Sequence, residues 1–378
     1  MWSLLAICGT DSMAYAVVLP IVPFAVKAAG GSFLATAAVF AAFSLCQLWA
    51  APLLGRISGS LGRKPVLVGS QIGSLAGFLL LAVAGSWPVM LLARAVDGAT
   101  AGNMAVVLAT VCDLEEPERR VANFAAINTA SAAGLLVGLG ICALLAGTSF
   151  SGVALVATAI CAFSIGVCAV AAFPPPKGGV EHVLLRTYFR RRGAPGRTAG
   201  ALVAVQVAFG ATAATLPAFL HYSVGVSVRV AVGAMAGALV VGGAIAQLVA
   251  RSCGDAVAVR GGCVLIAAGA AGLGLAGVHV PQGLVLAVGG AVALATGLIL
   301  GVSGATALLG RSLSGADPGV PMGLSQSAAS IGQLLGPAVG FALMAFSPPA
   351  LCVLIGVAAA VAVLVLGTPQ ASEAAVTP

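Results

Sequence analysis

The stretch WSLLAICGTDSMAYAVVLPIVPFAV, residues 2–26, is apolar apart from small hydroxyl side chains and one carboxylate, Asp11. A helix needs about 20 largely apolar residues to cross the hydrocarbon core of a bilayer, and this run is long enough. It has no basic leader and carries an acid in its middle, so it differs from a cleaved signal peptide. We therefore expect a mature membrane-spanning helix with an isolated acid near mid-depth.

The composition extends this expectation to the whole chain. Of its 378 residues, 60% are hydrophobic and 7% are charged, whereas soluble domains carry about 25% charged residues. The sequence predicts an all-α membrane protein with about twelve transmembrane helices. The predicted spans are residues 2–26, 32–54, 65–85, 87–112, 121–146, 150–173, 198–221, 228–250, 261–279, 282–309, 321–346 and 349–367.

Basic residues are concentrated in one set of connecting loops, which accounts for the formal net charge of +7 without nucleic-acid binding. By the positive-inside rule this set is cytoplasmic, and so are both termini. We expect a plasma or inner membrane rather than an organelle. The richer set holds Arg56, Arg63, Lys64, Arg119, Arg120, Lys177, Arg186, Arg190, Arg191, Arg192, Arg197, Arg251, Arg260 and Arg311, and the opposite set holds Lys27 and Arg229.

The longest loop divides the predicted spans six and six. We expect an N-terminal six-helix bundle over residues 1–173, a cytoplasmic basic linker over 174–197, and a C-terminal six-helix bundle with a short polar tail over 198–378. The middle of the linker, 183–192, is either an amphipathic helix on the membrane surface or a solvated connection.

The two halves resemble each other at an offset of about 197 residues. Three features at one offset predict two parallel six-helix repeats, an architecture in which transporters bind substrate near the midplane between the halves. The matching features are Leu19-Pro20 with Leu216-Pro217, Gly134 and Gly138 with Gly332 and Gly336, and Arg63 with Arg260.

Three ionisable residues lie inside the predicted spans: Asp11, Arg94 and Asp97. A charge at the centre of a span costs at least about 2.5–3.5 kcal/mol, so such groups face each other or an aqueous cavity. Arg94 and Asp97 are three residues apart and can pair on one helical face. Asp11 then binds a proton or a cation, because burial favours a neutral carboxyl group. The alternative is a structural ion pair between Asp11 and Arg94.

Uncharged polar residues in the spans complete the candidate proton and substrate site. Each is able to contact a substrate or to hydrogen-bond a neighbouring helix. They are Tyr15, Asn128, Gln206 and Gln326, with Asn103 as a further candidate.

Glycines recur at four-residue intervals in several predicted spans. They allow close helix packing, and smooth faces also let one half move against the other. Pro337 removes a backbone hydrogen bond and makes a hinge in the eleventh span plausible. The glycines are Gly69, Gly73 and Gly77, Gly98 and Gly102, Gly134 and Gly138, and Gly332, Gly336 and Gly340.

The sequence contains no phosphate-binding loop and no evident catalytic set, so we expect neither an enzyme nor a cofactor. The histidines His182, His221 and His279 lie in loops or at span ends, and the nine cysteines form no CxxC pair. We interpret the cysteines as small apolar residues rather than metal ligands.

Five stretches together resemble a known family. They are TDSMAYAVVLPIVP (10–23), GRISGSLGRKPVL (55–67), RAVDGATAG (94–102), DLEEPERRVANF (113–124) and GLSQSAASIGQLLGPAVG (323–340). The sequence resembles the major facilitator superfamily, and within it the twelve-span drug/proton antiporters that include tetracycline efflux proteins and vesicular amine transporters.

The resemblance implies a secondary transporter that works by alternating access and couples proton entry to efflux of a small organic compound, lipophilic or cationic. It implies that Asp11 binds the proton or cation and that Arg94 tunes the pKa of Asp11. It also implies that Asp97 balances the charge of Arg94. The signature motif, with Gly55, Gly62, Arg63 and Lys64, would form a cytoplasmic gate. The expected partners are the lipid bilayer, the solute and protons, and we expect a monomer.

Two departures from the family pattern keep other functions open. Gly59 stands where the signature motif usually has Asp, which predicts that Arg63 and Lys64 lack their usual partner. Leu139 follows Gly138 where antiporters usually have Pro, and the Pro survives only in the repeat copy, Pro337. A facilitator or symporter therefore remains possible, as does a non-transporting membrane sensor or assembly protein.

Overall fold

The computed structural model describes residues 1–114, 117–173, 194–277, 283–313 and 319–367. Within these ranges twelve helical segments are long and apolar enough to cross a membrane, which confirms the all-α, twelve-span prediction. The predicted linker and C-terminal tail lie almost entirely outside the described residues.

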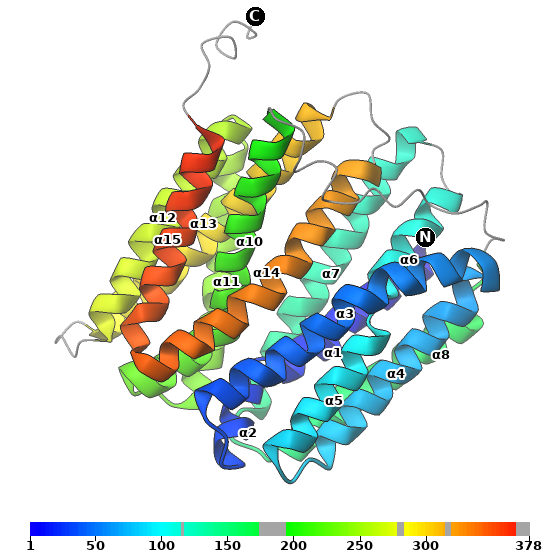
Figure 1. Ribbon diagram of the computed structural model, residues 1–378, viewed down its shortest axis with the longest axis horizontal. Helices are drawn as coiled ribbons and strands as arrows, with labels where there is room; N and C mark the ends of the chain where they lie inside the picture. The colour runs from blue at the N-terminus through cyan, green and yellow to red at the C-terminus, as the bar shows by residue number, and fades with distance from the viewer. Residues whose placement is uncertain (115–116, 174–193, 278–282, 314–318, 368–378) are drawn as a thin grey trace, which may run out of the picture.

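We call α1 to α8 the N-terminal half and α10 to α15 the C-terminal half (Figure 1). The N-terminal half comprises α1 (Trp2–Val18), α2 (Val22–Ala28), α3 (Phe33–Leu61), α4 (Arg63–Ala82), α5 (Trp87–Thr100), α6 (Asn103–Leu114), α7 (Pro117–Leu145) and α8 (Phe150–Val170). The C-terminal half comprises α10 (Ala194–Phe219), the π-helical turn η1 (Leu220–Val224), α11 (Val228–Ala250), α12 (Asp255–Ala276), α13 (Gly283–Ser312), α14 (Gly319–Phe346) and α15 (Pro348–Leu366).

The first span of each half is distorted near its Leu-Pro pair. In the N-terminal half α1 ends at Val18 and α2 begins at Val22, because Pro20 has no N–H to continue the helix. In the C-terminal half Pro217 remains inside α10. Where α10 ends, the helix widens into the π-helical turn η1, which begins at Leu220. Proline and π-helical turns are the usual causes of such distortions.

Several basic residues predicted to lie in loops are instead helical. The second span continues to Leu61, the third begins at Arg63, and only Gly62 lies between them, with a positive φ of 98°. The ninth span begins at Asp255 rather than at 261, so Arg260 is inside α12. Its guanidinium reaches the carbonyl of Gly367 at 2.8 Å, and long basic side chains commonly extend from a helix in this way.

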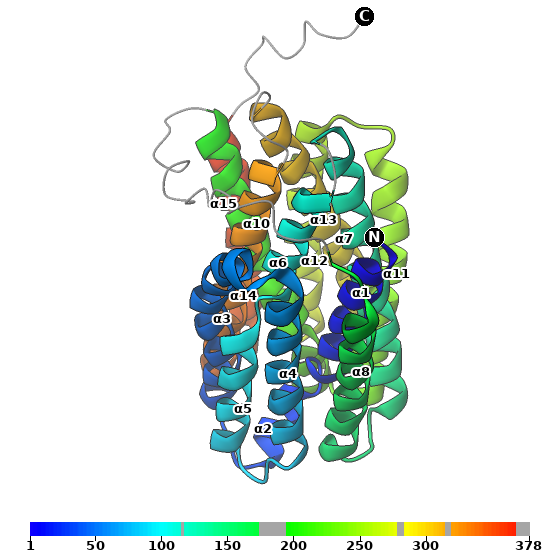
Figure 2. The ribbon, with the colours of Figure 1, turned by 90° about the vertical axis from the view of Figure 1, so that its right-hand side faces the viewer.

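Helix pairs pack in the same order in both halves. α1 contacts α7 as α10 contacts α14, α3 contacts α5 as α11 contacts α13, and α4 contacts α8 as α12 contacts α15. Figure 2 shows α4, α5 and α8 side by side on one face of the N-terminal half. Glycines bring matching backbones together: a Cβ on Gly134 would overlap the carbonyl of Gly9, and one on Gly332 would overlap that of Gln206.

We expect Gly134→Ala to destabilise the protein, because the added methyl would overlap backbone that cannot move without shifting α1. Overpacking of this kind costs about 1–3 kcal/mol. The matched control is Gly140→Ala in the same helix, where nothing lies within 4 Å of the added carbon. Thermal unfolding in detergent should separate the two variants, and equal unfolding temperatures would contradict the packing role.

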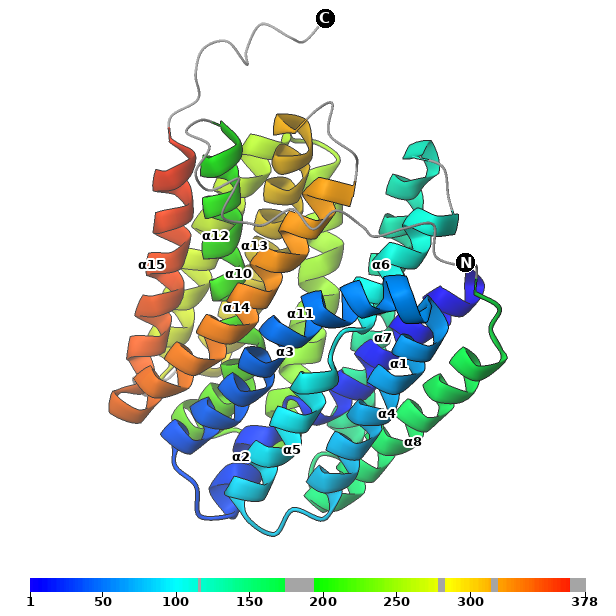
Figure 3. The ribbon, with the colours of Figure 1, turned by 45° about the vertical axis from the view of Figure 1, so that its right-hand side comes forward.

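The two halves meet toward one end of the molecule. We call the end where α1 begins and α3 turns into α4 the basic end, and the end where α2 leads into α3 and η1 into α11 the opposite end. α14 lies along α3 (Figure 3), and α11 contacts α7. At the opposite end the Phe33 and Phe341 rings stack at 6.5 Å, Phe24 and Tyr222 lie 5.8 Å apart, and Arg229 donates to the carbonyl of Ala146.

Candidate functional site

Asp11 lies where α1 meets α4, α6 and α8. Its Oδ2 accepts a hydrogen bond of 2.6 Å from Asn103 Nδ2. Its Oδ1 accepts from Ser164 Oγ at 3.1 Å and from Gln71 Nε2 at 3.4 Å. Each donor comes from a different helix and each is neutral. The carboxyl group is therefore held by hydrogen bonds, and no cation of the described residues forms an ion pair with it.

Arg94 and Asp97 form a buried ion pair within α5. The guanidinium lies 4.1 Å from the centre of the Phe43 ring and 5.6 Å from that of Tyr15, distances typical of cation–π contacts. Among the ion pairs of the described residues, Arg94 is joined to Asp97 and not to Asp11. The alternative pairing of Asp11 with Arg94 is not the one observed.

A cavity of about 300 Å³ is lined by both carboxylates. Asp11, Asp97 and Tyr15 line it from the N-terminal half, and Gln326 and Gln333 line it from α14 in the C-terminal half. The site is thus shared between the halves, although its ionisable groups come from the N-terminal half.

A second, mostly apolar cavity of about 110 Å³ adjoins the first. Tyr15, Phe43, Leu135 and Gln333 line both cavities. The remaining walls of the second cavity are chiefly Ala, Leu and Phe side chains with Pro337 of α14. A ligand spanning both cavities would meet carboxylates at one end and apolar side chains at the other.

Not every candidate residue lies at these cavities. Asn128 is exposed on α7, and Gln206 is buried on α10 against Gly332, and neither lines either cavity. Sequence reasoning missed Gln71 and Ser164, which hold Asp11 from other helices. Their only sequence signal is that a polar side chain stands in an apolar span, and many small hydroxyl residues share it.

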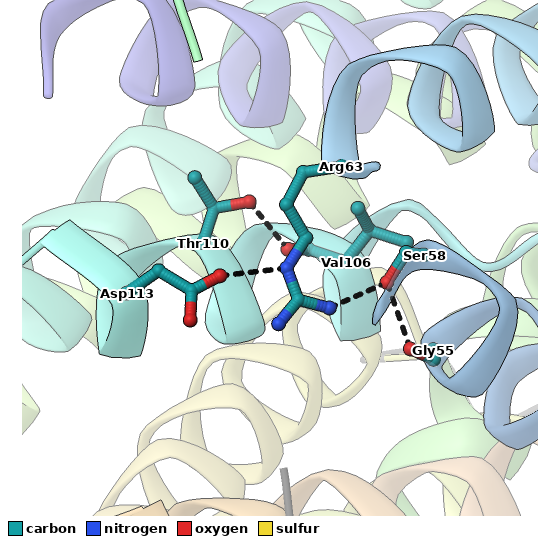
Figure 4. A network of polar contacts seen from close by, with 6 residues as sticks. All are labelled: Gly55, Ser58, Arg63, Val106, Thr110 and Asp113. Carbon is teal, nitrogen blue, oxygen red and sulfur yellow. Dashed lines mark hydrogen bonds and ion pairs between the residues drawn. The ribbon is translucent and has the colours of Figure 1, made fainter. Parts of the chain in front are cut away.

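The signature motif forms a buried network at the basic end (Figure 4). Arg63 is 1% exposed, and its Nε forms an ion pair of 2.7 Å with Asp113 at the end of α6. Its Nη1 donates to Ser58 Oγ, which donates to the carbonyl of Gly55, both at 2.7 Å. Lys64 Nζ donates to the carbonyls of Ala169 and Ala171, at the end of α8.

Gly59 leaves Arg63 and Lys64 without the family's usual carboxylate, but both residues have other partners. Asp113 supplies the carboxylate from another helix, and the carbonyls at the C-terminal end of α8 bind the ammonium group of Lys64. Basic side chains commonly bind the last, unpaired carbonyls of a helix.

Glycines of the fourth span allow α5 and α6 to approach α3. A Cβ on Gly98 would overlap the carbonyl of Phe43, and one on Gly102 would come within 2.5 Å of the Leu54 side chain. Gly138 and Gly336 make equally close approaches to the backbones of α1 and α10. These contacts support the packing role of the glycines, whereas their role and that of Pro337 as hinges stays a prediction.

Twelve membrane-length helices, with buried carboxylates lining a cavity between the two halves, are typical of multi-pass transporters. The chain belongs to the Major Facilitator Superfamily, whose family description matches residues 4–302. This membership confirms the resemblance drawn from the sequence.

Individual relatives are more distant. The tetracycline resistance protein, class G, of Vibrio anguillarum is 28% identical over 151 residues, which cover 38% of this chain and 38% of that protein. The matched segment therefore spans well under half the length of this relative.

Solved structures share the fold over nearly the whole chain. The nucleoside transporter NupG superposes with a TM-score of 0.74 at 13% identity, covering 97% of this chain and 96% of that one. The human organic anion transporter MFSD10 (TETRAN) superposes with a TM-score of 0.68 at 18% identity, covering 97% of both chains.

Proposed function

We propose that this protein is a secondary active transporter that exchanges protons for a small organic solute, with Asp11 as the proton site. One observation carries the proposal: Asp11 is held at a cavity by three neutral donors, while Arg94 is already paired with Asp97. A carboxyl group without a permanent counterion is able to gain and lose a proton during a transport cycle.

The orientation of the chain decides which side of the membrane the cavity faces. If the basic end is cytoplasmic, as the positive-inside rule suggests, then both termini are cytoplasmic. Among the described residues, the hydrogen bonds and ring contacts that join the halves lie at the opposite end or at mid-depth, as Ser44 with Gln333 does. This arrangement supports a state open toward the cytoplasm, from which a solute would be loaded for efflux.

The two adjoining cavities support a solute that is lipophilic on one side and cationic or hydrogen-bonding on the other. The carboxylates of Asp11 and Asp97 suit the polar side, and the apolar cavity suits the remainder. Similarity to a tetracycline resistance protein is compatible with efflux of such a compound.

A ligand-stabilisation screen at several pH values tests the proposal on purified protein. A ligand that binds the folded state raises the unfolding temperature with its concentration. We expect lipophilic cations to stabilise the protein more at pH 8 than at pH 5, because an ionised Asp11 attracts a cation and a protonated one does not. Stabilisation that does not change with pH would contradict proton–solute exchange at this site.

A facilitator is the second candidate, because Leu139 replaces the proline of the antiporter motif. Its transport would persist in vesicles whose pH gradient has been dissipated with a protonophore. An antiporter would lose accumulation under the same conditions.

A further inference from the structure

The fourth span is broken in its middle without a proline. α5 ends at Thr100 and α6 begins at Asn103, and the residues between them are Ala101 and Gly102. At the break the N–H of Gly102 donates to the carbonyl of Thr100 at 2.8 Å. Ser70 of α4 adds to this contact: its hydroxyl donates to the same carbonyl and accepts from the same N–H. The break is therefore a stable part of the fold, with its polar groups satisfied by a neighbouring helix.

Asn103, the first residue of α6, connects this break to Asp11. Its Nδ2 donates to the carboxylate, whereas its Oδ1 is buried and has no hydrogen-bond partner among the described residues. Gln71 is arranged similarly: its Nε2 faces Asp11 and Ser164, and its Oε1 is buried without a partner in the same part of the chain. Leaving such a group unpaired costs about 1–3 kcal/mol, so two unpaired oxygens beside one carboxyl group call for an explanation.

An amide carries a donor at one end and an acceptor at the other. A carboxylate only accepts hydrogen bonds, whereas a protonated carboxyl group also donates one. Rotation of the Asn103 amide about its terminal bond would therefore match it to either charge state of Asp11. The unpaired Oδ1 is the group that a protonated Asp11 would need.

Among the described residues, the other ionisable groups that line the cavity beside Asp11 are Asp97, Tyr15, Cys8 and Cys161. Asp97 is paired with Arg94 on α5, Tyr15 and Cys8 lie on α1, and Cys161 lies on α8. On α6 the acid is Asp113, at the far end of the helix and paired with Arg63. Asn103 is thus the group of α6 that touches the candidate proton site.

We propose that Asn103 is a positioning residue that couples the protonation of Asp11 to the angle between α5 and α6. When Asp11 is ionised, the charge-assisted bond from Nδ2 holds the first turn of α6 against α1. When a proton from the cavity binds Oδ2, an O–H bond forms, the bond from Nδ2 breaks, and Oδ1 accepts the new hydroxyl. The inference rests on the proposed role of Asp11 as the proton site.

The consequence is mechanical. The hydrogen bond between Asn103 and a neutral Asp11 is weaker than the charge-assisted one. It therefore lets α6 change its angle to α5 at residues 101–102, where the helical hydrogen-bond pattern is already interrupted. Because the other end of α6 carries Asp113, this movement would reach the Arg63 network at the basic end. Protonation in the middle of the membrane would in this way change the gate.

The test measures the position of α6 without knowledge of the substrate. Spin labels attached through p-acetylphenylalanine at Leu114 and Val170, exposed residues at the ends of α6 and α8, leave the native cysteines in place. Electron–electron resonance distances are recorded from pH 5 to pH 8 with protons as the only ligand. For the otherwise unchanged protein we expect two distance populations whose ratio changes with pH.

Three variants distinguish the roles. Asn103→Ala should lose the pH-dependent change. Asn103→Asp should move its midpoint upward by about one pH unit or more, because two facing carboxyl groups share a proton. Thr110→Val is the matched control in α6, since the Thr110 hydroxyl bonds to Val106 of its own helix, and it should keep the original amplitude and midpoint.

An Asn103→Ala variant that keeps the original change would overturn the proposal. So would an unchanged midpoint in Asn103→Asp, which decides the question even if the alanine variant fails to fold. Asp11→Asn separates this inference from the proposed function. If the distance change persists in Asp11→Asn, the proton site itself lies elsewhere.

Discussion

Asp11→Asn should abolish transport driven by a pH gradient in proteoliposomes while leaving expression and thermal stability largely intact. Asparagine keeps the size of the side chain and still hydrogen-bonds its neighbours, but it cannot exchange a proton. The variant corresponds to the protonated form, so it should resemble the original protein at low pH and diverge from it as the pH rises. Solute accumulation against a gradient is the measurement.

The matched control is Asp255→Asn, the same substitution at the start of α12, where the carboxylate pairs with Arg311. It should leave coupling unchanged. Unchanged proton-driven transport in Asp11→Asn would exclude Asp11 as the proton site. A large fall in its unfolding temperature would instead show that Asp11 mainly holds α1 against α4, α6 and α8.

Arg63→Ala should have the largest effect on stability. Removing one partner of a buried ion pair costs about 3–5 kcal/mol. Arg63 is 1% exposed, and its removal breaks both the ion pair with Asp113 and the hydrogen bond to Ser58. Unfolding of the purified protein by heat or denaturant should measure the loss.

The C-terminal half offers a matched comparison for this prediction. Arg311 pairs with Asp255 at 2.8 Å, but its side chain is 76% exposed. Exposed pairs contribute about 0–1 kcal/mol, so Arg311→Ala should change stability little. Equal losses for Arg63→Ala and Arg311→Ala would show that burial of the pair does not matter.

The spans and the charged residues of the site could be predicted from sequence because each depends on local information. The length of an apolar run sets a span, and an ionisable residue inside one is rare enough to identify Asp11, Arg94 and Asp97. The pairing of Arg94 with Asp97 also follows from their spacing on one helix.

Contacts between distant segments could not be predicted in this way. Asp113 lies 50 residues from Arg63, and no local pattern indicates that the end of α6 approaches the start of α4. The break at residues 101–102 is hydrogen-bonded by Ser70 of another helix. The same applies to Gln71 and Ser164, whose role depends on how α4 and α8 are rotated toward α1.

The opposite end is closed mainly by aromatic rings, which has a consequence for its response to conditions. Among the described residues no ion pair joins the two halves, so salt, which screens charges, should have little influence on that closure. Apolar contacts weaken on cooling. Temperature rather than ionic strength should therefore shift the balance between the state in which the opposite end is closed and the state in which it is open. Cooling should favour the state in which the opposite end is open.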